Sequence, residues 1–264
     1  MSDPNAERQN DDDGDGDSTN DESLPITPEQ VLEVLACGDF DTEHGAIRWS
    51  SNYTFLCSVT QGDLTVMAVY KPRSGERPLW DFPDGTLCQR ERAAYLTSAA
   101  MGLHQVPPTV LRDGPRGLGS VQFFIDHDPE YNYFSFDESL LPQLMQLSLF
   151  DVLVNNADRK GGHCIVDSEG RLWGIDHGIA FHSMHKLRTV IWNFAGQTIP
   201  ESLLTAVNTL CETVETVDSD YRTEMDQLLS LAEMNAFRKR IDRVLHTKVF
   251  PQPGPGPNYP WPPV

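Results

Sequence analysis

Short runs rich in apolar and β-branched residues, separated by turn residues, predict an antiparallel sheet in the first half of the chain. The predicted strands lie at 47–49, 53–59, 64–71, 106–110 and 120–125. Gln61-Gly62-Asp63 supplies a turn between the second and third of them. This order of strands and turns is typical of an antiparallel meander.

Apolar residues at helical spacing predict the remaining elements. Thr27 and Gln30 form a capping box at the start of a first helix, which Gly38 ends. Further helices are predicted at 87–101, 138–153, after a second capping box at 198–201, at 221–231 and at 232–245. The helix at 138–153 is apolar almost all round, so we expect it to be buried.

One polar stretch interrupts the helical half of the chain. It runs from residue 155 to residue 178 and reads NNADRKGGHCIVDSEGRLWGIDHG. Its centre predicts a short β-hairpin with a turn at 167–170. Asp158 precedes this hairpin and Asp176 follows it, so the two carboxylates lie at its two mouths. Because burying an unpaired carboxylate is very costly, neither is expected in an apolar core.

This stretch resembles the catalytic core of the phosphatidylinositol 3/4-kinase-like superfamily, in particular the type II phosphatidylinositol 4-kinases and the HipA-type kinases. Their shared pattern is N-x-D-R-x-x-x-N, a hairpin and then D-x-G. Five positions match it: Asn156, Asp158, Arg159, Asp176 and Gly178. His163 stands where that family has an asparagine metal ligand. The resemblance covers roughly 49–195, and the whole chain also resembles a bacterial family described as phosphatidylinositol 3/4-kinase-like.

The resemblance implies a two-lobed protein-kinase-like fold of the α+β class, with an antiparallel-sheet N-lobe and a mainly helical C-lobe. It divides the chain into an acidic disordered tail, an N-lobe, a C-lobe and a Pro-rich disordered tail, at 1–25, 26–126, 127–249 and 250–264. The implied activity is transfer of the γ-phosphate of ATP, with Mg²⁺ or Mn²⁺. We expect the acceptor to be a hydroxyl of a protein or a small molecule, because the chain lacks a broad basic face for anionic lipid.

The resemblance also implies nucleotide-binding residues in the first half of the chain. Lys71 ends an apolar strand, as in the kinase V-A-x-K signature, and Glu91 lies in an E-x-x-A-Y-L context that the resembled family shares. Such a pair holds the α- and β-phosphates. A turn over the phosphates and a hinge at the adenine supply the other expected contacts: Ser50, Ser51, Asn52, Gln122, Phe123 and Phe124. Each of these interpretations has an alternative. The turn residues could form an ordinary hairpin turn, the hinge residues could belong to a core strand, and Glu91 could be a surface charge.

Four residues of the polar stretch are assigned to catalysis or metal binding. Asp158 is expected to orient the acceptor hydroxyl. Arg159 is grouped with it as a catalytic residue, and its side chain is expected to pair with a local carboxylate or backbone carbonyl. His163 and Asp176 are the expected metal ligands, and an imidazole nitrogen suits Mn²⁺ better than Mg²⁺. Activity should then fall below about pH 6 as the imidazole protonates; alternatively, His163 simply caps the hairpin.

Composition narrows the expected partners and compartment. The net charge is -19, and 1–24 contains nine acidic residues and one arginine. Such a chain repels nucleic acid and anionic membranes, and its acidic tail is expected to be disordered. Five cysteines without paired spacing indicate reduced thiols. No apolar run of membrane-spanning length and no signal peptide is present, so we expect a cytoplasmic protein without stable membrane insertion.

Each of four local patterns in the sequence allows two interpretations. An EF-hand-like spacing at 11–22 lacks an apolar entering helix, which favours a solvated acidic tail. The segment 72–85 is a lid or substrate loop, or an insertion clamped by Trp80 and Phe82. Basic residues at 238–243 favour the dipole of a helix C-terminus, or form a patch for a membrane or an acidic partner. Seven prolines within 251–264 indicate disorder, or a peptide for an aromatic groove.

Two other functions compete with a kinase. A nucleotide-binding pseudokinase, acting as an interaction protein, would explain the departure at His163. A metal-dependent hydrolase would use the cluster His163, Asp176, His177 and His182. The hydrolase is the weaker hypothesis because no H-x-x-x-H or H-E-x-x-H spacing is present and because it leaves Lys71 and Glu91 without a role.

Overall fold

The computed structural model describes residues 26–46 and 53–264. The acidic tail, the strand expected at 47–49 and the turn expected at Ser50, Ser51 and Asn52 lie outside these residues. None of the described helices is long and apolar enough to cross a bilayer.

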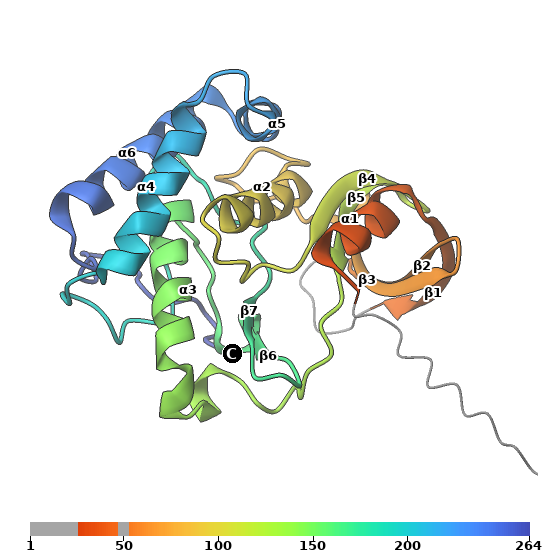
Figure 1. Ribbon diagram of the computed structural model, residues 1–264, viewed down its shortest axis with the longest axis horizontal. Helices are drawn as coiled ribbons and strands as arrows, with labels where there is room; N and C mark the ends of the chain where they lie inside the picture. Colours follow the sequence, from red (N-terminus) through yellow and green to blue (C-terminus); the bar gives the residue numbers. More distant parts are fainter. Residues whose placement is uncertain (1–25, 47–52) are drawn as a thin grey trace, which may run out of the picture.

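A curled, five-stranded antiparallel sheet forms one end of the molecule (Figure 1). Its strands pair in the order β1-β2-β3-β5-β4, with bounds β1 Asp39–Ala46, β2 Phe55–Gln61, β3 Leu64–Pro72, β4 Thr109–Gly114 and β5 Gly117–Phe123. Helix α1, Pro28–Cys37, packs on this sheet and begins with the predicted Thr27–Gln30 capping box. Strand β1 was not predicted because its sequence, DFDTEHGA, contains little apolar alternation; it is an edge strand, where such polar sequences are tolerated.

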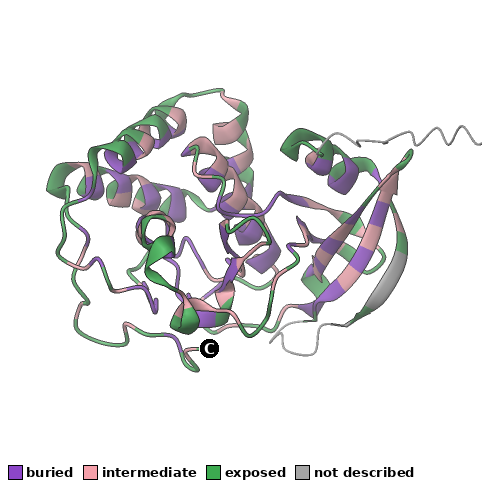
Figure 2. Cartoon of the chain, turned by 60° about the horizontal axis from the view of Figure 1, so that its bottom comes forward, coloured by how far each residue is buried: buried purple, intermediate pink, exposed green. Residues whose placement is uncertain are grey.

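Along β3, buried residues alternate with partly buried ones, and Figure 2 shows such alternation along the strands of the sheet. Val66, Ala68 and Tyr70 are buried in a core shared with α1. Because successive side chains of a strand point to opposite faces, Val69 and Lys71 lie on the other face.

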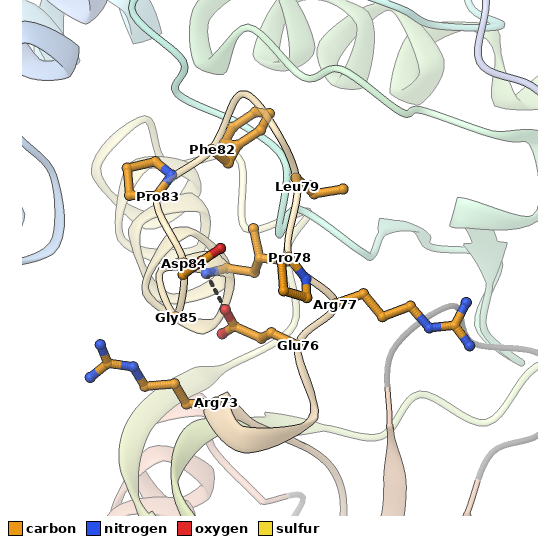
Figure 3. A pocket seen from close by; sticks show the side chains of 10 residues that line it. Arg73, Glu76, Arg77, Pro78, Leu79, Phe82, Pro83, Asp84 and Gly85 are labelled. Carbon is orange, nitrogen blue, oxygen red and sulfur yellow. Dashed lines mark hydrogen bonds between the residues drawn. The ribbon is translucent and has the colours of Figure 1, made fainter.

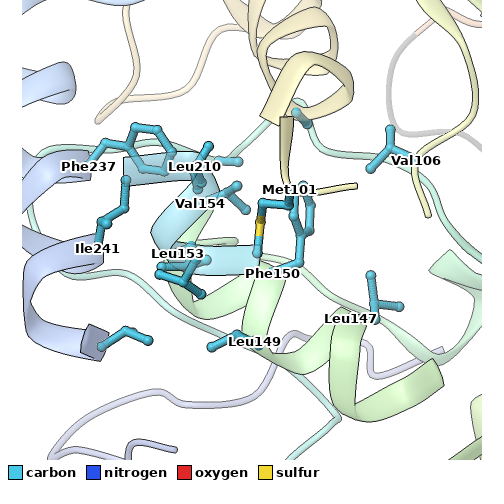
Figure 4. Packing of buried hydrophobic residues seen from close by; sticks show 14 of the residues in the cluster. Met101, Val106, Leu147, Leu149, Phe150, Leu153, Val154, Leu210, Phe237 and Ile241 are labelled. Atoms are coloured by element: carbon cyan, nitrogen blue, oxygen red, sulfur yellow. The ribbon is translucent and has the colours of Figure 1, made fainter. Parts of the chain in front are cut away.

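Helices form the other end of the molecule around a second, larger core (Figure 4). They are α2 Leu87–Ala100, α3 Leu141–Val154, α4 Glu201–Glu215, α5 Asp220–Leu228 and α6 Leu231–Thr247. Short 3-10 helices lie at Arg73–Gly75, Tyr133–Ser135, Glu138–Leu140 and Gly161–His163. A two-stranded hairpin, β6 Cys164–Val166 and β7 Leu172–Gly174, follows the last of these. The sheet followed by helices confirms the predicted α+β class; the boundary at residue 126 stays a prediction.

The predicted disorder of 250–264 is wrong. Phe250 is only 2% exposed, and its carbonyl accepts a hydrogen bond from the N–H of Gly196 at 3.0 Å. Farther along, the carbonyls of Asn258 and Pro263 accept from Thr189 and Gly161, at 3.1 and 2.8 Å. Prolines remove donors but keep their carbonyl acceptors, so an extended Pro-rich segment can still be held by the donors of a neighbouring surface.

The second predicted capping box does not form. Helix α4 begins at Glu201, with Pro200 in the N-cap position and no side chain capping it. Thr198 instead forms a β-bridge with Val249. The backbone before α4 is therefore held by pairing with the C-terminal segment, and not by the local cap that the sequence pattern predicts.

Candidate active site

Three elements that are distant in sequence meet at Lys71. Its Nζ lies 2.5 Å from Oε1 of Glu91 on α2 and 3.0 Å from Oδ1 of Asp176, which follows β7. Burial opposes the charge of Lys71, but the carboxylates of Asp176 and Glu91 outweigh that effect and raise its pKa. The site therefore contains a fixed ammonium between two carboxylates.

The backbone after β7 turns at Asp176, which is followed by the buried His177. Asp176 has a φ of 61°, a left-handed conformation that is uncommon for a residue with a β-carbon. The N–H of His177 donates to the second oxygen of Glu91 at 2.9 Å. One glutamate therefore fixes both the strand that bears Lys71 and the turn that bears Asp176.

His163 is oriented by a hydrogen bond to the backbone. Its Nδ1 donates to the carbonyl of Asp158 at 2.8 Å, which leaves the lone pair of Nε2 free. Nε2 lies 3.3 Å from Oδ2 of Asp176. Two electron-pair donors that face each other at this distance are suited to a cation between them, and a hydrogen bond on the opposite ring nitrogen is the usual support for a metal-binding histidine.

The pKa of His163 corrects one expectation. Burial lowers the pKa of His163 from the ordinary value to about 4, so the imidazole stays neutral as the pH falls from 7 to well below 6. Protonation of this ring is therefore expected near pH 4, below the pH of about 6 that the pKa of an exposed histidine predicts.

Asp158 lies at the mouth of the hairpin beside a second cation. Its side chain is 26% exposed, and Oδ2 is 3.7 Å from Nζ of Lys160. Burial raises the pKa of Asp158 to about 6, an effect that Lys160 opposes and Asp176 reinforces. Sequence analysis gave Lys160 no role in the site. Its position two residues after Asp158 was the signal that could have indicated one.

Arg159 is not a catalytic residue in the sense of touching a substrate. Its side chain is fully buried and forms two hydrogen bonds with the carboxylate of Asp151, at 2.9 and 3.0 Å. Nη1 donates to the carbonyls of His163 and Ile175, at 2.8 and 2.9 Å. Arg159 therefore positions both strands of the hairpin. Asp151 was missed, although a lone acid in a buried apolar helix signals a buried partner.

Two backbone N–H groups of the expected hinge already have hydrogen-bond partners within the protein. The N–H groups of Phe123 and Phe124 donate to the carbonyls of Pro108 and Met67, at 2.8 and 2.9 Å. The side chain of Gln122 donates to Oγ1 of Thr109 at 2.8 Å. The N–H groups of Phe123 and Phe124 are thus unavailable to an adenine, because neighbouring backbone already uses them.

A small apolar cluster lies between the end of β5 and the hairpin. Its buried members are Ile125, Ile165 and Trp173, with Phe123 and Ile175 packed against them. This cluster packs the hairpin against the end of β5.

The segment between β3 and α2 joins the two ends of the molecule. Glu76 accepts the N–H groups of Leu87 and Cys88 at the start of α2, beside a pocket of about 180 Å³ (Figure 3). Phe82 is buried against the ring of His182, with ring centroids 5.0 Å apart, whereas Trp80 is 91% exposed. Phe82 therefore clamps this segment, and the exposed ring of Trp80 lies with its centroid 5.2 Å from Nζ of Lys186.

The metal-hydrolase hypothesis does not fit this geometry. His177 is fully buried, and its Nε2 accepts from Nη2 of Arg159 at 2.6 Å. Nε2 of His182 lies 2.8 Å from the carbonyl of Asp81. Among the described residues, no three His, Cys, Asp or Glu side chains are grouped to hold a metal. The pair His163 and Asp176 fits instead a metal that also binds phosphates, since Mg²⁺ commonly takes one or two protein ligands.

Comparisons with solved structures place the fold among kinases. The chain matches the Golgi casein kinase with Mn/ADP bound at a TM-score of 0.55 and 13% identity, over 83% of this chain and 74% of that one. It matches the Helicobacter pylori proinflammatory kinase CtkA at a TM-score of 0.51 and 12% identity, over 82% and 94% of the two chains. At these identities the likeness shows the kinase-like fold alone.

Sequence comparison gives a closer relative. No family model matches the chain. Protein Rv2133c of Mycobacterium tuberculosis is 39% identical over 265 residues, covering 87% of this chain and 94% of the mycobacterial protein. The chain therefore belongs to the family of the mycobacterial protein Rv2133c.

Proposed function

We propose that the protein is an ATP-dependent phosphotransferase that transfers the γ-phosphate to a hydroxyl of a protein or a small molecule. The observation that carries this proposal is the junction of Lys71 with Glu91 and Asp176, with Nε2 of His163 facing the other oxygen of Asp176. A fixed ammonium and a metal site beside it are the two parts that hold the phosphates in kinases.

Each group of the site has a role in this chemistry. Lys71 binds the phosphates, and Asp158 orients the acceptor hydroxyl and accepts its proton. A pKa near 6 suits a carboxylate base that works close to neutral pH. Lys160, beside Asp158, stabilises the charge on the transferred phosphoryl group. A Mg²⁺ or Mn²⁺ held by His163 and Asp176 would neutralise phosphate charge.

The neighbouring fold supports this assignment in part. The Golgi casein kinase structure has Mn/ADP bound, which supports a nucleotide and a divalent metal as ligands of this fold. The finer placement in the phosphatidylinositol 3/4-kinase-like superfamily rests on the motif alone. A pseudokinase would share the nucleotide site but would not transfer phosphate.

ATP with a divalent metal is expected to stabilise the protein against heat. A ligand at a hundredfold its Kd adds about 2.7 kcal/mol to the free energy of unfolding. For a protein of this size, the melting temperature should rise by roughly 5 to 10 °C. The measurement is a thermal melt with millimolar ATP and Mn²⁺ or Mg²⁺. The Lys71→Met variant should lose the shift, and Lys239→Met, on the exposed face of α6, should keep it. No shift in the wild-type protein would refute the proposed site.

His163 is expected to set the metal preference. His163→Asn replaces an imidazole nitrogen with an amide oxygen, so the affinity for ADP should come to favour Mg²⁺ over Mn²⁺. His163→Ala should weaken metal-dependent ADP binding with either ion. Calorimetric titration of ADP at fixed metal concentration measures both effects, with the exposed His104→Asn as the matched control. Unchanged affinity and preference in His163→Ala would show that this imidazole is not a ligand.

A further inference from the structure

A cavity of about 590 Å³ lies in the helical part of the molecule. It is lined by α3, 185–187, Gly196, α6 and the C-terminal segment after α6. Its size lies within the range of small-molecule sites. The residues assigned above to the nucleotide, the metal and the acceptor do not line it.

Positive charge dominates the lining of this cavity. Arg240 and Arg243 supply this charge, and no acidic residue is among its described lining residues. His185 also lines the cavity, but burial and the two arginines lower its pKa, which favours the neutral ring. Neither arginine lies within ion-pair distance of a carboxylate in the described part of the chain. In a protein with a net charge of -19, such a surface favours an anion.

Arg240 is fixed at the cavity by the protein itself. Its Nε donates to the carbonyl of Leu153 at 2.7 Å, and Nη1 contacts the carbonyl of His182 at 3.4 Å. Its Nη2 is shielded from solvent and has no hydrogen-bond partner. Burial lowers the pKa of Arg240 to about 10, and the charge of Glu233 opposes this effect only in part. A negative charge in the adjoining cavity would stabilise this guanidinium through surroundings of low dielectric constant.

The rest of the lining is mainly apolar, with Thr247 and Gln252 as its polar side chains. Val152 and Leu187 lie on one side, and Val249 and Phe250 on the C-terminal segment. Val249 is 38% exposed, whereas Phe250 is buried against Phe194, with ring centroids 5.8 Å apart. An apolar group that covers Val249 would remove hydrophobic surface from water.

We propose that this cavity binds an anionic amphiphile, a phosphate monoester or carboxylate that bears an apolar group. The anionic head lies beside Arg243, Arg240 and His185, and the apolar group lies along Val249 and Leu187. This site is separate from the proposed nucleotide site and does not depend on it.

The test is calorimetric titration of the full chain with octyl phosphate in monomeric solution. Octyl phosphate and octanoate are expected to bind. 1-Octanol lacks the anionic head and inorganic phosphate lacks the apolar group, so each should bind at least about tenfold more weakly. Binding of octanol as tight as that of octyl phosphate, or no heat with octyl phosphate up to its solubility limit, would overturn the proposal.

Two matched variants on one helix localise the binding. Arg243→Gln removes an exposed cation from the cavity, and octyl phosphate should bind it about tenfold more weakly. Lys239→Gln removes the same charge from α6 outside the cavity and should leave the affinity unchanged. Equal affinities for the two variants would show that the amphiphile binds elsewhere and would refute this site.

Discussion

Replacing Asp176 with Ala is expected to abolish metal-dependent nucleotide binding. One oxygen of this carboxylate holds Lys71 at 3.0 Å, and the other faces Nε2 of His163 at 3.3 Å. Its loss leaves a single candidate protein ligand for the metal and frees Lys71 from one of its two anchors. Removing a residue that only hydrogen-bonds to a metal ligand typically lowers metal affinity by about 10–100-fold. Removing a ligand itself should therefore lower metal affinity by at least about 100-fold.

Calorimetric titration of ADP with and without Mn²⁺ measures this loss. Glu169→Ala, at the exposed turn of the same hairpin, is the matched control and should bind as the wild-type protein does. Melting curves of both variants check that they fold. A folded Asp176→Ala variant with wild-type affinity for Mn²⁺ and ADP would contradict the assigned metal site.

Asp158→Asn is expected to separate catalysis from binding. The amide cannot accept the proton of the acceptor hydroxyl, so turnover should fall by about 10²–10⁴-fold. Affinity for the nucleotide should change little, because Asp158 lies at the acceptor side of the hairpin and makes no contact with Lys71 or Glu91. Turnover and ADP titration are measured together, with Asp128→Asn on the exposed surface as the control.

The pH dependence gives the same prediction a second readout. A base must be ionised to accept a proton, and burial raises the pKa of Asp158 to about 6. Wild-type turnover should therefore be constant above that pH and decrease as the pH falls through about 6. The residual turnover of Asp158→Asn should lack this decrease. A wild-type decrease that the variant retains would assign the titration to another group.

The residues that local motifs define could be predicted from the sequence. Asp158, His163 and Asp176 flank one short hairpin, whose turn residues are evident, so their proximity follows from local structure alone. The junction of Lys71 with Glu91 joins a strand and a helix, and the sequence supplied it only through their resemblance to a kinase pattern.

Features that depend on tertiary packing could not be predicted. A carboxylate partner for Arg159 was expected, but its identity as Asp151 depends on how the segment after α3 packs against that helix. The N–H groups of Phe123 and Phe124 donate to Pro108 and Met67 because β5 lies between β3 and β4, an order that the sequence does not specify. Likewise, the Pro-rich C-terminal segment is ordered because donors from other elements meet its carbonyls.

The most direct test of the central claim is mass spectrometry of a lysate incubated with the pure protein and ATP labelled on its γ-phosphate. The account predicts that label appears covalently on an acceptor hydroxyl, that this requires Mn²⁺ or Mg²⁺, and that Asp158→Asn reduces it by about 10²-fold or more. Nucleotide binding without any labelled acceptor above the level of the Asp158→Asn variant would contradict phosphate transfer and identify a nucleotide-binding protein instead.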